Sequence, residues 1–157
     1  MAGASRDSIR THNACYDHID FLTEPVRLAR ELANSGVYAM KIWPFDDIAK
    51  ETGGQYITAD QMRRGMEPLR LIKEEFGDTM DVAMEFHGYW NLPCAIQIAH
   101  ALEPYKPMWL EEMLQLVTTT LPVANGVVPL PQGPGLGVEL TPHVFARPDV
   151  TVERIGE

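Results

Sequence analysis

The sequence predicts an α/β fold in which short buried strands alternate with amphipathic helices. Three apolar runs of strand length, residues 37–43, 82–86 and 108–110, are separated by stretches whose apolar residues recur at helical spacing. A helix between two buried strands is typical of a parallel βαβ unit. We therefore expect a parallel sheet, and ligands in such folds bind at the carboxyl ends of the strands.

Length and composition set the class of protein. The chain has 157 residues, of which 45% are hydrophobic and 22% are charged, as in a globular domain with a real core. Its formal net charge of -9 argues against nucleic acid or an anionic membrane as the main partner. It has no apolar run of about 18 residues and no signal-peptide pattern, so a cytoplasmic location is expected. The spacing of the two cysteines is not that of a metal site.

The amino-terminal part predicts a strand, a helix and a second strand. Residues 8–16 form a plausible strand with weak alternation. Thr23 is the predicted N-cap of a helix that has Pro25 in its first turn and ends at Gly36. The next strand, 37–43, is almost entirely apolar and carries one charge, Lys41, which would need an anionic partner.

The following segment predicts a loop and then a long helix. Residues 44–57 contain a Gly-Gly break and read as a loop, with their aspartates as surface charges and caps. Thr58 and Gln61 form a capping box, the helix ends at Gly77, and Pro68 is expected to kink or divide it. The residues predicted to face inward are Met62, Met66, Leu69, Ile72 and Phe76.

The next two strands each end at acidic residues. Strand 82–86 is followed by His87 and contains Glu85 near its end, Asn91 can cap the helix that comes next, and strand 108–110 is followed by Glu111. In a parallel sheet Glu85, His87 and Glu111 would share one site. Two carboxylates on adjacent strands repel each other, so a divalent cation between them is the expected solution.

Four segments resemble one known family. They are AMKIWPFD (39–46), MEFHGYW (84–90), ALEPYKPMWLEE (101–112) and PGLGVEL (134–140). They resemble the enolase superfamily, and within it the mandelate racemase-like acid-sugar dehydratases, galactonate dehydratases most closely. The resemblance implies a (β/α)₈ barrel that holds one magnesium ion on carboxylates at the ends of its third, fourth and fifth strands.

The resemblance also implies a role for each site residue. Glu85 matches the first metal ligand, where relatives more often have Asp, and Glu111 matches the second. His87 matches the acid that protonates the departing hydroxyl group. Lys41 matches a catalytic lysine that touches the substrate carboxylate. Trp43, a candidate substrate-binding residue, replaces the lysine that is the base in many relatives, which favours dehydration over racemisation.

The expected fold is therefore a partial TIM-type (β/α) barrel of about four βα units over residues 8–113. Residues 114–157 resemble the family's carboxyl-terminal tail. The capping domain, barrel strands five to eight, the third metal ligand and the His-Asp base dyad have no counterpart. A full barrel needs about 250 residues, more than the 157 present.

Three functions remain open at this point. The first is a magnesium-dependent hydro-lyase that acts on a sugar acid, an aldonate or an aldarate. The second is a truncated, catalytically incomplete product that keeps the family's motifs without the activity. The third is a half-barrel subunit that completes its site as a homo-oligomer.

Overall fold

The computed structural model describes residues 8–15, 18–113, 140–146 and 151. The chain divides into two compact units, residues 1–114 and 115–157. In the second unit the structure describes a short 3₁₀ helix, η2 (Pro142–Ala146). Most of the predicted tail, including all but the last residue of the PGLGVEL segment, lies outside the described residues. The site is built in the first unit.

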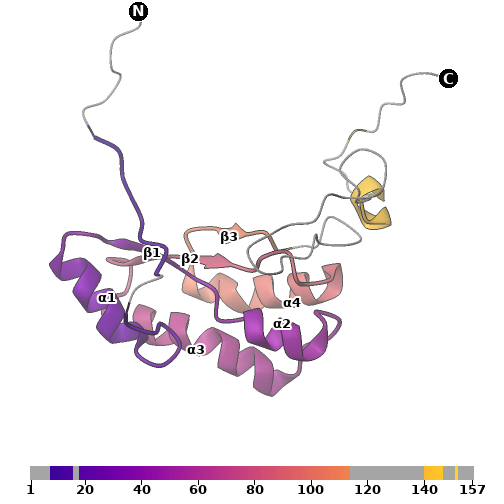
Figure 1. The fold of residues 1–157 in the computed structure, drawn as a ribbon, viewed down its shortest axis with the longest axis horizontal. Coiled ribbons are helices and arrows are strands. Elements are labelled where there is room, and N and C mark those ends of the chain that lie inside the picture. The colour runs from indigo at the N-terminus through magenta and orange to yellow at the C-terminus, as the bar shows by residue number, and fades with distance from the viewer. Residues whose placement is uncertain (1–7, 16–17, 114–139, 147–150, 152–157) are drawn as a thin grey trace, which may run out of the picture. The chain divides into compact units, whose positions relative to one another are not determined.

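A three-stranded parallel sheet forms the centre of this unit (Figure 1). Its strands β1 (Ala39–Ile42), β2 (Asp81–Glu85) and β3 (Leu110–Glu111) lie side by side in chain order. The register pairs Lys41 with Ala83, and Glu85 with Glu111. The predicted α/β class, with parallel strands joined through helices, is confirmed.

The predicted strand 8–16 is reduced to a single bridge between Asn13 and Met40. The backbone N–H of Asn13 donates to the carbonyl oxygen of Ala39 (2.9 Å), and that of Lys41 donates to Asn13 (2.8 Å). The pairing stops because Cys15 adopts a left-handed conformation, with φ 56°, and its N–H donates to the Asn13 side chain instead. The predicted strand over residues 8–16 was therefore wrong in its length.

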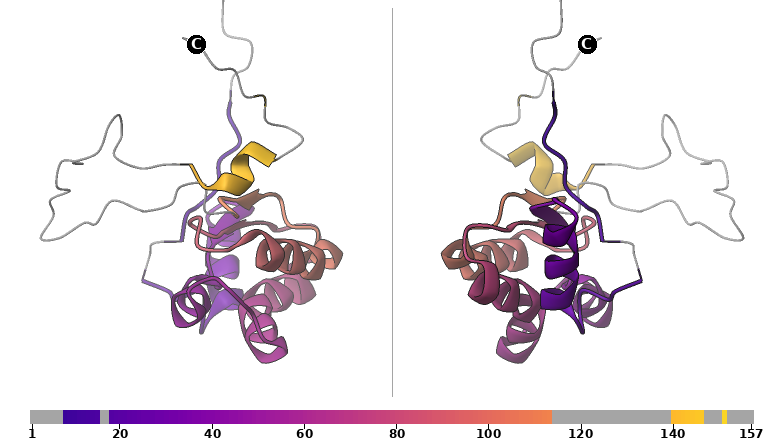
Figure 2. Two further views of the ribbon diagram at one scale, coloured as in Figure 1. Left: turned by 90° about the vertical axis from the view of Figure 1, so that its right-hand side faces the viewer. Right: turned by 90° about the vertical axis from the view of Figure 1, so that its left-hand side faces the viewer.

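Three helices, α1 (Pro25–Asn34), α3 (Ala59–Phe76) and α4 (Leu92–Leu102), cover one face of the sheet (Figures 1 and 2). Side chains alternate along a strand, so Met40 and Val82 point to this face and are fully buried in the core. The same alternation turns Lys41 and Glu85 to the opposite face. In a (β/α) barrel that opposite face is the barrel interior.

Two of the three predicted helix caps are confirmed. Thr58 and Gln61 form the capping box at the start of α3, with reciprocal bonds of 3.2 and 3.0 Å. Asn91 caps α4, where its side chain accepts from the N–H of Cys94 at 3.0 Å. The cap predicted at Thr23 is wrong by one residue, because α1 starts at Pro25 with Glu24 at the N-cap and no side-chain cap bond.

Pro68 was predicted to kink or divide its helix, and residues 44–57 were predicted to form a loop. Pro68 lies inside α3, which continues unbroken from residue 59 to 76, so it does not divide the helix. Part of the predicted loop 44–57 is a helix, α2 (Asp46–Thr52). Two acidic residues in its first turn and a left-handed glycine, Gly53 with φ 61°, at its C-cap favour this helix.

A 3₁₀ turn, η1 (Glu103–Tyr105), links α4 to β3, which starts later than the predicted strand 108–110.

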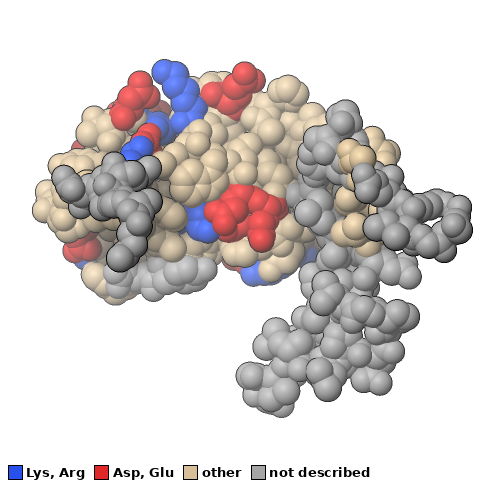
Figure 3. All heavy atoms as spheres, turned by 90° about the horizontal axis from the view of Figure 1, so that it is seen from above, with Lys and Arg blue, Asp and Glu red and all other residues tan. Residues whose placement is uncertain are grey.

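The surface of the described residues carries both signs of charge. On the face drawn in Figure 3, Asp and Glu side chains lie next to Lys and Arg side chains rather than in a separate field. No helix in the described ranges combines the length and the apolar character that crossing a membrane requires.

Candidate active site

The two strand-end carboxylates face each other across the sheet. Glu85 and Glu111 are direct partners in the β2–β3 register, so they lie on the same face. Like charges at directly opposite positions destabilise a sheet. The ammonium group of Lys41 lies 2.8 Å from Oε2 of Glu85 and 3.0 Å from Oε2 of Glu111. These three side chains form what we call the Lys41–Glu85–Glu111 cluster.

Lys41 reaches both acids because of its place in the register. It pairs with Ala83, two residues before Glu85 on the same face, which is within reach of a long side chain. The side chains of Lys41, Glu85 and Glu111 are 16%, 6% and 37% exposed, so two of the three charges are largely removed from water. Lys41 and Glu111 each favour the charged form of the other. Hydrogen bonding to Glu85 raises the pKa of Lys41, and hydrogen bonding from Lys41 lowers the pKa of Glu111.

An aromatic donor also holds Glu111. The indole N–H of Trp109 donates to Oε2 of Glu111 at 3.0 Å and contributes to the lowered pKa of this acid. The imidazole of His12 packs edge-on against Trp109, with ring centroids 5.2 Å apart. His12 therefore lies beside the cluster, behind the tryptophan that touches it.

The second oxygen of Glu85 shapes the end of β2. Oε1 accepts the backbone N–H groups of both Phe86 and His87 at 3.2 Å. His87 adopts a left-handed conformation with φ 48°, and Glu112 at the end of β3 does the same with φ 47°. Such conformations cost energy for residues other than glycine and concentrate at functional sites. They turn the chain sharply at the edge where the acids lie.

His87 contacts a buried acid that sequence analysis assigned to the surface. Its Nδ1 atom lies 2.9 Å from Oδ2 of Asp46, in the first turn of α2, and Asp46 is only 8% exposed. Burial raises the pKa of Asp46, and the charge of His87 opposes that shift. The interpretation of Asp46 as a surface charge was wrong. No local sequence pattern predicts the contact between Asp46 and His87, because Asp46 lies in a segment that was predicted to be a loop.

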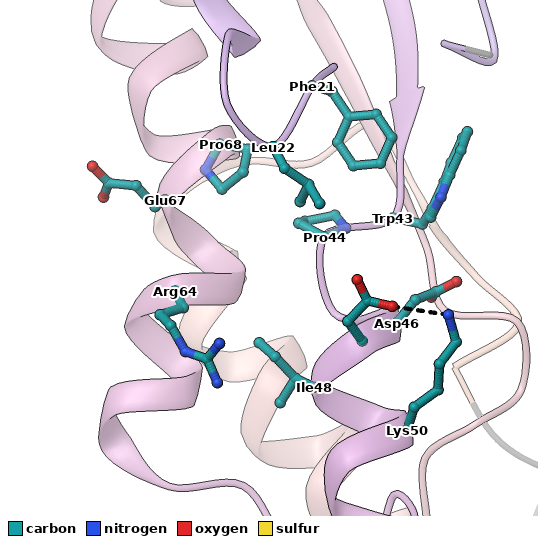
Figure 4. Close-up of a pocket in the computed structure, with 11 residues that line it drawn as sticks. Phe21, Leu22, Trp43, Pro44, Asp46, Ile48, Lys50, Arg64, Glu67 and Pro68 are labelled. Carbon is teal, nitrogen blue, oxygen red and sulfur yellow. Dashed lines mark hydrogen bonds and ion pairs between the residues drawn. The ribbon is translucent and has the colours of Figure 1, made fainter.

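Trp43 links His87 to a cavity. Its ring is edge-on to His87, with centroids 6.1 Å apart, and edge-on to Phe21 at 4.7 Å. A cavity of about 370 Å³ opens beside these residues (Figure 4). Its lining residues are Phe21, Leu22, Trp43, Pro44, Asp46, Asp47, Ile48, Lys50, Arg64, Glu67 and Pro68. None of the three residues of the Lys41–Glu85–Glu111 cluster lines the cavity.

The charges that line this cavity are already paired. Lys50 forms an ion pair with Asp47 at 2.8 Å, drawn as the dashed line in Figure 4, and Arg64 with Glu51 at 3.1 Å. The cavity wall therefore presents apolar and aromatic surface rather than an unpaired cation for an anionic ligand.

The cluster fits a magnesium ion in the kind of donor it offers. Magnesium prefers carboxylate oxygens, and Glu85 and Glu111 already share one cation, the ammonium group of Lys41. Within the described residues, however, no group of three or more His, Cys, Asp or Glu side chains is placed to surround a metal ion. Any magnesium bound here would have two carboxylate ligands from this part of the chain.

Known proteins resemble the chain over the region that holds the cluster. Residues 24–118 match the family model described as Enolase C-terminal domain-like. A D-gluconate dehydratase from Thermoproteus tenax is 29% identical over 119 residues, which are 73% of this chain and 22% of that protein. A D-gluconate/D-galactonate dehydratase from Picrophilus torridus is 25% identical over 64% of this chain and 24% of that protein.

A solved structure shows the same arrangement of elements. It is an enolase of the mandelate racemase subgroup from Agrobacterium tumefaciens, 41% identical in sequence, with a TM-score of 0.64 over 73% of this chain and 29% of that chain. The chain thus spans about a quarter of the length of the relatives that it matches.

Proposed function

Because the chain belongs to the Enolase C-terminal domain-like family of the enolase superfamily, we propose that residues 8–113 supply part of the active site of an acid-sugar dehydratase. The observation that carries the proposal is the Lys41–Glu85–Glu111 cluster, with His87 two residues beyond Glu85. The dehydratase names of the relatives from Thermoproteus tenax and Picrophilus torridus support an aldonate as the substrate class.

In this reaction a base removes the proton next to the sugar-acid carboxylate, and the neighbouring β-hydroxyl group leaves as water. The resulting enol becomes a 2-keto-3-deoxy acid. His87 is the proposed acid: it donates a proton to the departing hydroxyl group, a task for which imidazole is suited because its pKa lies near neutrality. Lys41 binds the substrate carboxylate, and Trp43 forms a wall of the substrate site. The base lies outside the residues assigned here.

Glu85 and Glu111 are the proposed magnesium ligands. When bound, the ion would act as a Lewis acid toward the substrate carboxylate. Magnesium usually keeps several positions for water and substrate, which suits a site with two carboxylates. Lys41 provides the cation that keeps these two carboxylates together on the sheet.

We also propose that other strands close the barrel. Among the described residues β3 pairs with β2 alone, so its outer edge is free to accept another strand. The remaining strands of a family barrel would come from outside residues 8–113, either from the rest of the protein or from a second copy. Residues 114–157 are the proposed counterpart of the family's carboxyl-terminal segment.

The proposal is tested by titrating the folded chain with magnesium chloride in a calorimeter, after circular dichroism has verified folding. We expect binding with Kd near or below about 1 mM. The heat should disappear in Glu85→Gln and Glu111→Gln and persist in Glu103→Gln, a matched change at an exposed acid in η1. A folded chain that does not bind magnesium, or binds it equally well in all variants, would overturn the metal assignment.

The substrate class is tested by a second titration. With magnesium present, D-gluconate and D-galactonate should bind, and Lys41→Met should weaken their binding at least tenfold. If neither aldonate binds the magnesium-loaded chain, the proposed substrate class is wrong.

A further inference from the structure

We propose that Asp46 is a positioning residue for His87: its buried carboxylate holds the imidazole with Nδ1 turned inward and leaves Nε2 for the reacting group. The functional meaning rests on the proposed function, in which His87 is the acid. The contact between Asp46 and His87 does not depend on the proposed function, and it is tested separately.

The first argument is the burial of both partners at their contact. The Nδ1 atom of His87 is inaccessible to water, while the side chain as a whole is 33% exposed. The ring therefore buries its Nδ1 edge against Asp46, and Nε2 is not among the buried atoms without a partner in the described residues. Oδ2 of Asp46 and Nδ1 of His87 lie 2.9 Å apart, which is within ion-pair distance, but the orientation of the ring does not make this contact a hydrogen bond.

The second argument is the cost of burying Asp46 where it lies. Its Oδ1 atom is also inaccessible and has no hydrogen-bond partner among the described residues, which is an expensive arrangement for a carboxylate. The imidazole of His87 is the ionisable partner that the structure gives this acid. Buried, costly carboxylates concentrate at functional sites.

The third argument is that other contacts also restrain His87. Its backbone is held in the left-handed conformation by the bond from its N–H to Oε1 of Glu85. Its ring contacts two aromatic neighbours, Trp43 at 6.1 Å and Tyr89 at 5.9 Å between centroids. Asp46 completes this set by fixing which nitrogen faces the protein. A partner on one imidazole nitrogen sets the tautomer and the role of the other.

The proposal therefore assigns each proton of the ring to one nitrogen atom. The neutral ring carries its proton on Nδ1, toward Asp46, and the second proton of the charged ring is on Nε2. The proton donated to a leaving hydroxyl group is then the Nε2 proton.

The test is a long-range ¹H–¹⁵N spectrum of the uniformly labelled chain at about pH 9, where imidazoles are neutral. His87→Gln assigns the His87 signals by their loss. In the unsubstituted chain we expect Nδ1 to be the protonated nitrogen. In Asp46→Ala the ring should shift toward the Nε2–H form that free imidazole side chains prefer.

Asp47→Ala is the matched control, because Asp47 is the next residue of α2, is 73% exposed and pairs with Lys50. It should leave the His87 signals unchanged. Asp46→Asn is the second variant, in case the alanine variant does not fold, and should also change the His87 nitrogen shifts. An Nε2–H tautomer in the unsubstituted chain, or His87 signals that ignore Asp46, would overturn the proposal. Failure of the magnesium or aldonate titrations would overturn the proposed function and leave the result for Asp46 and His87 unchanged.

Discussion

The ammonium group of Lys41 lies 2.8 Å from Oε2 of Glu85, so the sheet supplies a cation to a carboxylate that is almost completely buried. Removing this cation leaves the buried carboxyl group of Glu85 without its counter-ion in a medium of low polarity. We therefore expect Lys41→Met to reduce the free energy of unfolding by about 3 kcal/mol, measured by urea denaturation.

Two variants control for the loss of a lysine in general. Lys50→Met breaks an exposed pair with Asp47 and should cost less than about 0.5 kcal/mol. The double variant Lys41→Met/Glu85→Gln removes the uncompensated charge and should recover part of the loss. If Lys41→Met is no more costly than Lys50→Met, the cluster does not stabilise the sheet.

The two adjacent glycines after α2 should differ sharply in tolerance to alanine. Both have positive φ, 61° at Gly53 and 67° at Gly54, so alanine is strained at either position. A Cβ at Gly53 meets nothing, whereas a Cβ at Gly54 would collide with the backbone carbonyl of Tyr89. We expect Gly53→Ala to cost about 1 kcal/mol and Gly54→Ala about 3 kcal/mol or more in unfolding free energy.

The same two glycine variants also report on the site. Tyr89 lies two residues after His87, and the carbonyl of Gly54 accepts the N–H of Asn91 at 3.0 Å. Gly54→Ala should therefore perturb the His87 nuclear resonances more than Gly53→Ala does. Equal losses of stability in the two variants would mean that the close approach of the two loops is not maintained in solution.

Cys94 should be unreactive in the folded chain. Its side chain is buried near the start of α4, and burial raises the pKa of its thiol above the ordinary value of 9.0. In a Cys15→Ala background, alkylation by iodoacetamide at about pH 8 should be much slower for the folded chain than for the chain in urea, because the thiolate is the nucleophile. Equal rates in the two states would show that Cys94 is not protected.

The raised pKa of Cys94 also predicts how the free energy of unfolding changes with pH. As pH rises past 9.0 the unfolded thiol ionises first, so the unfolded state binds fewer protons than the folded state. The free energy of unfolding should then fall with rising pH. Cys94→Ala should show a shallower fall over the same range, measured by urea denaturation at several pH values.

The capping box of α3 should make a measurable contribution to stability. Thr58→Ala removes the side-chain oxygen that accepts the N–H of Gln61, which should cost about 1 kcal/mol in thermal or urea denaturation. Thr79→Ala, at an exposed threonine just beyond the same helix, should change stability by less than about 0.5 kcal/mol. If both variants lose the same amount, the cap at Thr58 does not explain the effect.

The sequence by itself determined the α/β class, the parallel order of the strands, the caps at Thr58 and Asn91, and the placing of Glu85 and Glu111 at the strand ends. These features depend on local signals. Apolar periodicity records which face of an element is buried, and a capping side chain bonds to a backbone group three residues away. Such information is contained in a short window of residues.

Only the tertiary structure decided which charged groups meet. The contact of Lys41 with both acids depends on the strand register. The contact of Asp46 with His87 depends on the packing of α2, a helix that the loop-like composition of residues 44–57 did not predict. The shortening of strand 8–16 to one bridge likewise follows from the turn at Cys15. The physical reason is that partners far apart in the chain are joined by packing, for which no local pattern carries a signal.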